Sequence, residues 1–474
     1  MTRSRRGRWT PIARGVLVLA AILLLPLAAT LQTPRESAAQ SAGQDSLWAV
    51  SGGTVGVCVD PSSSASLSGC FASATSTWPG SYDQAVATDG VNVYFVGEAD
   101  GGLSCPIAGL GANCTPIMAG PWPHQSCPSS GCEPVVLAAA NGFLWIGQFN
   151  GQIYRCPSNL PYVKQNSAPS QCVLLDDAGQ RPVYSLLLAN GTLYAGLGAY
   201  GSEQKKQGLL WSCSPDTVNS CAYLDGYGNT EAYSLTAGGG YLWAGLADGR
   251  IWQCDLNIEN ACDTDFETAG GYVNSLSYDG QGTLYAAIQS NGNKNPGVIW
   301  SCPTAYANGC SNVLSDASGH SVAAGAGGVF SSTYPDGDLH FNTSPFTSEN
   351  GNIFDSSILL YIPAEGPVGV GGVKMNFSAN RLSQKIENRC ATPGKTPKGI
   401  VPITGPNNFP KTMKVGACDL VQSGSMTHRV DLLDPGDYTV TVQAGKHSGE
   451  ASFTIVPDQT KPVKVKLTRG STGG

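Results

Sequence analysis

The sequence predicts an all-β protein, mainly because one short pattern recurs along most of the chain. The pattern is an apolar strand, a tight turn and a second apolar strand that usually ends at a cysteine, as in Tyr241–Cys254. Successive copies are 46, 51, 49, 49, 42 and 46 residues apart when they are aligned on Leu47, Val93, Leu144, Leu193, Leu242, Leu284 and Phe330. A period in the forties built from short strands is typical of β-propeller blades.

Each repeat divides into four strands joined by turns. In the fourth copy we expect strands at Val183–Ala189, Thr192–Gly196, Leu209–Cys213 and Cys221–Leu224. Asn-Gly, Asp-Gly and Gly-Gly pairs recur at the turns, because a two-residue hairpin requires positive φ at both central positions. Seven copies of the central hairpin predict a seven-bladed β-propeller, with six blades as the alternative. The innermost strand of the first blade comes either from Gln40–Gly43 or from a later segment that inserts there.

The cysteine content indicates an exported protein with disulfides. All copies except the seventh contain cysteines, which fall into neighbouring pairs, and an even number in an exported chain favours disulfides over metal ligation. We expect the first cysteine to end the third strand and the second to begin the fourth. The expected pairs are Cys58 with Cys70, Cys105 with Cys114, Cys127 with Cys132, Cys156 with Cys172, Cys213 with Cys221, Cys254 with Cys262, Cys302 with Cys310, and Cys390 with Cys418.

Residues 1–39 are predicted to be a targeting segment. Several arginines precede the uncharged run Gly15–Leu31, and Ser37-Ala38-Ala39 offers a small-residue cleavage site. A cleaved signal peptide is favoured over a retained N-terminal membrane anchor, because the run is short for a bilayer span and contains Pro26. We therefore expect a secreted protein or one held at the extracytoplasmic cell surface.

The repeat resembles the two-component-regulator propeller repeats of bacteria. The matching residues are Tyr184-Ser-Leu186 with Leu193–Gly196, and Tyr233-Ser-Leu235 with Leu242–Gly245. The resemblance covers residues 40–345 and implies a propeller fold without indicating an activity. Those repeats belong to intracellular sensors, from which this chain differs by its disulfides.

After residue 345 the repeat is expected to end and a small β-sandwich to follow over 346–470, with a flexible tail at 471–474. We expect strands at Ile358–Ile362, Tyr438–Val442, Ala451–Val456 and Val463–Leu467. The stretch Leu433–Val442 resembles the Pro-Gly-x-Tyr-x-Val-x-Val hairpin of carboxypeptidase-regulatory-like and transthyretin-like modules. That resemblance implies an accessory role in binding or spacing.

The sequence favours a non-catalytic function. It contains no Gly-x-Ser-x-Gly elbow, phosphate-binding loop, His-Glu-x-x-His motif or dinucleotide fingerprint. A sialidase-like propeller needs an arginine trio, and the repeats hold only Arg155, Arg181 and Arg250. The main hypothesis is a binding or scaffold protein for a glycan or protein ligand, without nucleic acid. The alternative is an extracellular glycan hydrolase or lyase with its site in the central channel.

Two sets of residues have alternative interpretations. We interpret the aromatic residues repeated in the second strand as packing between blades, with sugar-stacking sites as the alternative. They are Trp48, Tyr94, Trp145, Tyr194, Trp243 and Tyr285. Asp176 and Asp225, each four residues after a cysteine, could ligate calcium, although hydrogen bonds to the backbone of their turns are preferred. No other cofactor is expected.

Charge divides the chain. Residues 46–345 hold 7 Lys+Arg and 22 Asp+Glu, whereas residues 366–474 hold 14 and 7. Lys464 and Lys466, two apart in a predicted strand, should project from one face, and Lys461 would extend them into a patch. We expect this basic module to contact an anionic cell-envelope polymer or anionic lipid; the alternative is an ordinary solvated face.

Overall fold

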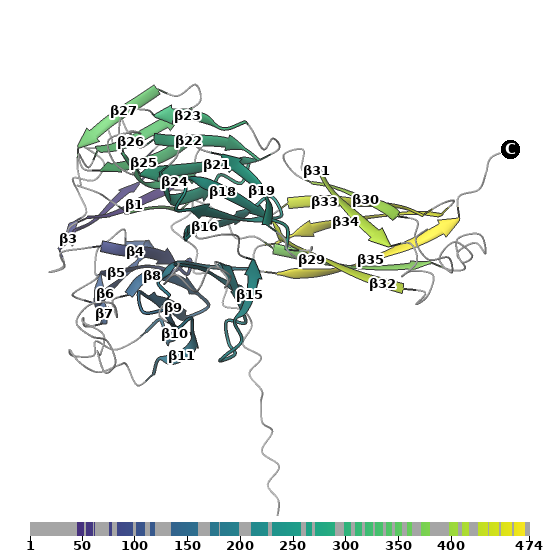
Figure 1. The fold of residues 1–474 in the computed structure, drawn as a ribbon, viewed down its shortest axis with the longest axis horizontal. Coiled ribbons are helices and arrows are strands. Elements are labelled where there is room, and N and C mark those ends of the chain that lie inside the picture. Colours follow the sequence, from purple (N-terminus) through teal and green to yellow (C-terminus); the bar gives the residue numbers. More distant parts are fainter. Residues whose placement is uncertain are drawn as a thin grey trace, which may run out of the picture. The chain divides into compact units, whose positions relative to one another are not determined.

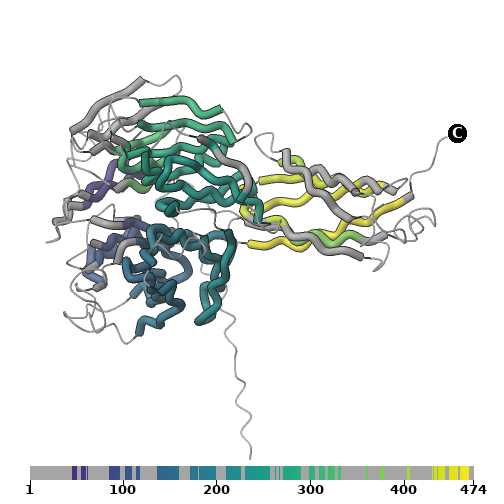
Figure 2. Tube along the Cα trace, in the orientation of Figure 1, coloured from purple at the N-terminus to yellow at the C-terminus, as the bar shows by residue number. Residues whose placement is uncertain are grey.

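The computed structural model consists almost entirely of β-strands (Figure 1). It describes the strands given below and the turns beside them, between residues 45 and 469; longer segments outside the description are 62–74, 119–133, 160–170, 199–209, 290–297, 363–370, 380–397 and 417–424. Uncertain residues are grey in Figure 2. The described residues include one short 3-10 turn, η1 (Ile107–Gly109), and no helix long and apolar enough to cross a membrane. The predicted targeting segment lies outside them.

The described residues up to Ile362 form seven four-stranded antiparallel sheets. The first contains β28 (Ile358–Ile362), β1 (Ser46–Ser51), β2 (Thr54–Val59) and β3 (Thr75–Thr77). The next three are β4 (Asp83–Thr88), β5 (Asn92–Gly97), β6 (Gly101–Pro106) and β7 (Thr115–Met118); β8 (Pro134–Ala140), β9 (Phe143–Gln148), β10 (Gln152–Pro157) and β11 (Val173–Asp177); and β12 (Val183–Ala189), β13 (Thr192–Leu197), β14 (Leu210–Cys213) and β15 (Ala222–Asp225). The last three are β16 (Ala232–Gly238), β17 (Tyr241–Leu246), β18 (Arg250–Cys254) and β19 (Cys262–Glu267); β20 (Tyr272–Tyr278), β21 (Thr283–Gln289), β22 (Val298–Pro303) and β23 (Ser311–Leu314); and β24 (Ser318–Gly325), β25 (Gly328–Tyr334), β26 (Asp338–Thr343) and β27 (Thr347–Asn352).

The innermost strands of these propeller-like repeats contact one another in a ring. The order runs from β28 through β4, β8, β12, β16, β20 and β24 back to β28. Serine hydroxyls join neighbouring members: Ser234 Oγ donates to the Val273 carbonyl at 2.8 Å, and Ser321 Oγ accepts from the Leu359 amide at 3.2 Å. Ser234 and Ser321, which occupy equivalent positions in their inner strands, therefore link one repeat to the next.

A segment from far along the chain completes the first sheet. β28 pairs with β1 in antiparallel register from Ser46↔Ile362 to Val50↔Ile358. Of the two sources that the sequence leaves open for this strand, the later segment supplies it. The strands of the repeat consequently run to Ile362, past residue 345, where the sequence predicts their end. The strand predicted at Ile358–Ile362 is present, but it belongs to the first sheet and not to the C-terminal strands.

The repeated aromatic residues are packed between neighbouring sheets. All six positions of the second strand are buried, with Trp48 and Trp243 completely inaccessible. The apolar clusters each draw on successive sheets; one contains Trp145 of β9 together with Leu193 of β13. The packing interpretation is therefore correct for these residues, and they present no ring of sugar-stacking sites.

Five disulfides join neighbouring cysteines within single sheets of the described residues. They are Cys105–Cys114, Cys156–Cys172, Cys213–Cys221, Cys254–Cys262 and Cys302–Cys310. Each closes the hairpin between the third and fourth strands, a short loop for which the chain-entropy model gives about 2–3 kcal/mol. Cys58 is also disulfide-bonded, and the remaining predicted disulfide cysteines lie outside the description: Cys70, Cys127, Cys132, Cys390 and Cys418. Disulfides persist in oxidising compartments, so they point to an extracytoplasmic environment.

The C-terminal strands form a seven-stranded sheet in the order β31-β30-β33-β34-β35-β29-β32. They are β29 (Gly371–Ala379), β30 (Lys398–Thr404), β31 (Pro410–Gly416), β32 (Ser425–Leu433), β33 (Gly436–Ala444), β34 (His447–Ile455) and β35 (Thr460–Arg469). Among the described residues, strand pairing joins its two halves between β34 and β35, at His447↔Arg469 and Ser448↔Thr468. Buried residues of both halves, among them Phe377, Tyr438 and Val465, nevertheless form one hydrophobic core.

The end of β32 contacts the inner strands of the repeats. Asp434 accepts hydrogen bonds from the Gly239 amide at 3.2 Å and from the Tyr278 hydroxyl at 3.0 Å, and the Leu432 carbonyl accepts from the Gly240 amide at 2.7 Å. Leu432 has a left-handed φ of 58° and is fully buried in a cluster with residues of the fourth and fifth sheets. Such a backbone persists only where its surroundings impose it, so packing and hydrogen bonds together specify this junction.

The pairing of β28 with β1 predicts that Leu359→Ala destabilises the fold. Leu359 is 5% exposed, and a buried leucine truncated to alanine typically costs about 2–5 kcal/mol. Leu174→Ala is the matched control, because Leu174 is 41% exposed on the outer strand β11. Denaturant titration should show the loss for Leu359→Ala alone; equal effects of the two substitutions would contradict the closure of the ring by β28.

The junction should depend on pH through Asp434. Burial raises the pKa of this carboxyl from 3.8 to about 6, partly offset by the hydrogen bonds from Gly239 and Tyr278. Because the folded pKa lies above the unfolded one, the protonated form is favoured on folding, and stability falls by about 3 kcal/mol as pH rises from about 4 to about 6. Asp434→Asn should abolish this dependence. Thermal melts between pH 4 and 7 should show a Tm difference between the two proteins that changes through this window, and a constant difference would refute the assignment.

Candidate ligand-binding site

A bulge interrupts six of the seven innermost strands near the same point. The pairing of these strands with their second strands shifts between Asp83 and Ala85, Pro134 and Val136, Val183 and Ser185, Ala232 and Ser234, Val273 and Ser275, and Gly319 and Ser321. A bulge leaves one residue out of the ladder and re-aims its side chain, and bulges are enriched beside functional sites. The bulged residues whose side chains the structure describes are Tyr184, Tyr233, Asn274 and His320.

The glycine of the Leu-Trp-Ala-Gly motif is required beside the bulge. A Cβ at Gly245 would overlap the hydroxyl of Ser234 and the side chain of Val273, which belongs to the next sheet. Gly196 is equally close to Ser185 and Ala232. Only glycine therefore lets three strands approach one another at this point.

Four aromatic rings form a continuous series, the aromatic arc, consisting of Phe149, Tyr184, Tyr233 and Tyr272. Successive ring centroids are 6.1, 4.5 and 5.6 Å apart. The two ends are exposed, Phe149 by 46% and Tyr272 by 38%. The rings belong to successive sheets, because Phe149 follows β9 and the tyrosines lie at the starts of β12, β16 and β20.

The aromatic arc and the C-terminal junction lie at opposite ends of the same strands. Tyr233 is the second residue of β16, whereas Gly239 directly follows that strand and contacts Asp434. Tyr272 begins β20, and Tyr278 at its end also contacts Asp434. The aromatic arc is therefore at the end of the inner strands remote from the junction.

Polar groups accompany the rings. The Tyr233 hydroxyl donates to Glu231 Oε2 at 2.8 Å, and Asn274 Nδ2 donates to Gln289 Oε1 at 2.8 Å. Burial, followed by the neighbouring Glu231, raises the pKa of Tyr184 and that of Tyr233; for Tyr233 the Glu231 hydrogen bond contributes as well. Both phenols consequently remain protonated and act as hydrogen-bond donors at neutral pH.

A cavity of about 410 Å³ lies between the inner strands. All seven of these strands contribute to its lining, which includes Tyr184, Tyr233 and Asn274. The other polar lining residues are serines and one threonine, and no lining residue carries a charge. Ser185 is buried, and its hydroxyl has no hydrogen-bond partner among the described residues. The cavity thus offers small apolar surfaces with hydroxyl, phenol and amide groups.

Other candidate residues from the sequence have local roles. Asp176 Oδ2 accepts from the Cys221 amide and Asp225 Oδ2 from the Cys262 amide, each at 2.9 Å. Both carboxylates therefore accept hydrogen bonds from backbone, as the preferred interpretation states, and these two partners lie in the next sheet. Asp176 also has a local partner, because its Oδ1 accepts from the Asp177 amide at 2.8 Å. No group of three or more metal-ligating side chains occurs among the residues described. Arg155 forms an ion pair with Asp216 at 2.7 Å.

Sequence reasoning assigned no binding role to the aromatic arc. Tyr184 and Tyr233 belong to the Tyr-Ser-Leu motif, which indicates the fold and not a ligand. The repeat nevertheless contains a pattern that could have indicated a binding site. The position before the conserved-looking Ser-Leu or Ser-Val pair is Tyr, Tyr, Asn and His in four successive copies. Such variation beside constant neighbours indicates a position that packing does not determine.

No protein family and no curated protein matches the chain. Among solved structures, similar chains include the computationally designed Ika8 protein (12% identity, 67% of this chain and 90% of that chain, TM-score 0.43). Others come from a mitotic checkpoint complex (12%, 60% and 85%, 0.45) and from the Pan2 WD40 domain of Neurospora crassa (10%, 60% and 81%, 0.39). At these values the similarities assign neither a family nor a function.

Two roles of the Asp225 carboxylate can be distinguished by experiment: a hydrogen bond to the Cys262 amide and the ligation of calcium. Asp225→Ala should lower stability by about 1–3 kcal/mol, because it leaves a partly buried backbone N–H without its acceptor, whereas Asp225→Asn retains an acceptor and should lose less. Calcium should not raise the Tm of the wild-type protein. A calcium-dependent rise in Tm that Asp225→Asn removes would show that this carboxylate binds metal.

Proposed function

We propose that this protein is an extracytoplasmic, disulfide-stabilised β-propeller that binds carbohydrate at the aromatic arc. The propeller has seven blades over residues 46–362, and a C-terminal β-sandwich module follows from about residue 371. The seven four-stranded sheets, their ring of inner strands and the single core of the C-terminal strands support this organisation. No catalytic step is part of the proposal.

The observation that supports a carbohydrate ligand is the combination of exposed rings with planar polar groups. A sugar ring has an apolar C–H face, which is stabilised against an aromatic ring by burial from water, and a rim of hydroxyls that need hydrogen-bond partners. Phe149 and Tyr272 supply exposed rings, and the Asn274–Gln289 amide pair and Glu231 lie on the same strands or beside them. A series of four rings suits an oligosaccharide better than a single sugar.

The groups in the cavity favour binding over hydrolysis. Glycoside hydrolysis by the common route uses two carboxyl groups placed on either side of the scissile bond. The described lining supplies hydroxyls, phenols and an amide instead.

The test is binding of the intact protein, with its disulfides formed, to a panel of oligosaccharides. Tyr272→Ala and Phe149→Ala should each weaken binding of the selected oligosaccharide about three- to tenfold, since an aromatic contact contributes about 0.5–1.5 kcal/mol. Tyr223→Ala is the matched control, because Tyr223 is 52% exposed on the outer strand β15. Calorimetry that finds equal losses for all three variants, or no oligosaccharide bound at all, would reject the proposal.

A further inference from the structure

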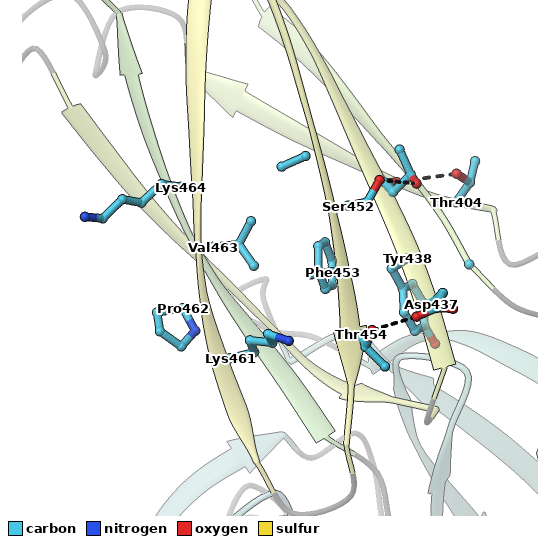
Figure 3. Close-up of a pocket in the computed structure, with 13 residues that line it drawn as sticks. Thr404, Asp437, Tyr438, Ser452, Phe453, Thr454, Lys461, Pro462, Val463 and Lys464 are labelled. Carbon is cyan, nitrogen blue, oxygen red and sulfur yellow. Dashed lines mark hydrogen bonds between the residues drawn. The ribbon is translucent and has the colours of Figure 1, made fainter.

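The lysines of β35 lie on two different sides of the strand. Lys464 and Lys466 are exposed and alternate with buried apolar residues, so both project from the outer face of the sheet. Lys461 has the parity of Val463, and Figure 3 shows it on the side of Thr454, whereas Lys464 points away. The expectation that Lys464 and Lys466 share a face is therefore confirmed, and Lys461 does not join them.

A lysine from the neighbouring strand joins the outer face instead. β29 runs parallel to β35, with Asn376 opposite Lys464 and Lys374 opposite Pro462. Lys374 is exposed, while its neighbour Met375 is buried in the core. Lys374, Lys464 and Lys466 thus form one surface, the basic face. On the other side of β29, Lys374 is in register with Arg429 of β32.

The basic face has no described counter-charge. Neither of the two ion pairs among the described residues involves a lysine. Asp437 and Glu450 belong to β33 and β34, in the other half of the seven-stranded sheet. The three lysines therefore leave positive charge at the surface that an anionic ligand would neutralise.

We propose that the basic face binds a linear polyanion with repeated carboxylate or phosphodiester groups. Lys464 and Lys466 are about 6.6 Å apart along a straight strand, and neighbouring strands lie about 4.8 Å apart, so the ammonium groups can meet successive charges of an extended polymer. A bilayer surface fits less well, because the described outward positions, Pro462 and Thr468 besides the lysines, include no aromatic or long aliphatic anchor. This site is independent of the carbohydrate site at the aromatic arc.

The experiment measures binding of the intact protein to long-chain polyphosphate, to polygalacturonate and to vesicles of anionic phospholipid. Three contacts predict a salt slope near −2, so affinity for the polymer should fall about twentyfold from about 0.1 M to about 0.4 M salt. The double variant Lys464→Gln/Lys466→Gln should bind at least tenfold more weakly and show a shallower slope. Internal groups of polyphosphate are anhydrides that carry one negative charge each, as a phosphodiester does, so the two polymers distinguish a phosphoryl from a carboxylate charge as the preferred group.

Lys461→Gln is the matched control, since it removes one charge from the same strand on the other side. Lys464→Gln alone should weaken binding severalfold, Lys464→Arg should restore it, and Lys461→Gln should leave it within twofold. Unchanged melting temperatures would exclude unfolding as the cause. If Lys461→Gln and Lys464→Gln weakened polymer binding equally, binding would depend only on the net charge of the protein, and the proposal would be overturned. So would tighter binding to the vesicles than to either polymer, or no salt-dependent binding.

Discussion

The pairing of β28 with β1 is the contact on which the rest of this structure depends. It joins residues 46–50 to residues 358–362, so the strands of the other four-stranded sheets all lie between the two paired segments in the sequence. The entropy of closing such a loop grows only slowly with its length, and the pairing removes two unpaired strand edges that would otherwise invite association. Ser321 extends the same contact to the last sheet through the Leu359 amide. With the ring closed, every inner strand has a neighbour on both sides, and the positions of its two ends are fixed.

Within that ring, the same small set of constraints is repeated while the side chains at one end vary. Glycine in the second strand makes room for the bulge, and serine after the bulge links one inner strand to the next. The bulged residue lies outside the regular ladder, and it is Tyr184, Tyr233, Asn274 or His320 in different sheets. The inner strands thus form a repeated scaffold whose side chains vary at one end, where we propose the carbohydrate site. The basic face belongs to separate strands, and the polyanion proposed for it is a different chemical class of ligand.

The fold was largely predictable because its signals are local. Strand period, turn dipeptides and paired cysteines are set by neighbouring residues, and the strand predicted at Val183–Ala189 is observed with the same bounds. Long-range pairing was not predictable. The residues Ile358–Ile362 indicate a strand, but nothing in them indicates that this strand pairs with β1. The aromatic arc was not predictable either, because bulges determine the direction of the Tyr184 and Tyr233 side chains. A bulge changes the strand pairing and leaves no mark in the composition of the strand. Lys464 and Lys466 could be placed on one face because side chains alternate along a strand, and the same alternation puts Lys461 on the opposite side.

The central claim is that a ligand lies across the aromatic arc at one end of the inner strands. Hydrogen–deuterium exchange of the intact protein, with and without a bound oligosaccharide, tests it most directly because it locates the contact without altering any residue. If the ligand lies across the aromatic arc, we expect slower exchange in peptides that contain the turn after β9 and the starts of β12, β16 and β20. The exchange rates of the outer strands β11 and β15 should not change. Protection confined to β33, β34 and β35, or spread evenly over the outer strands, would contradict it.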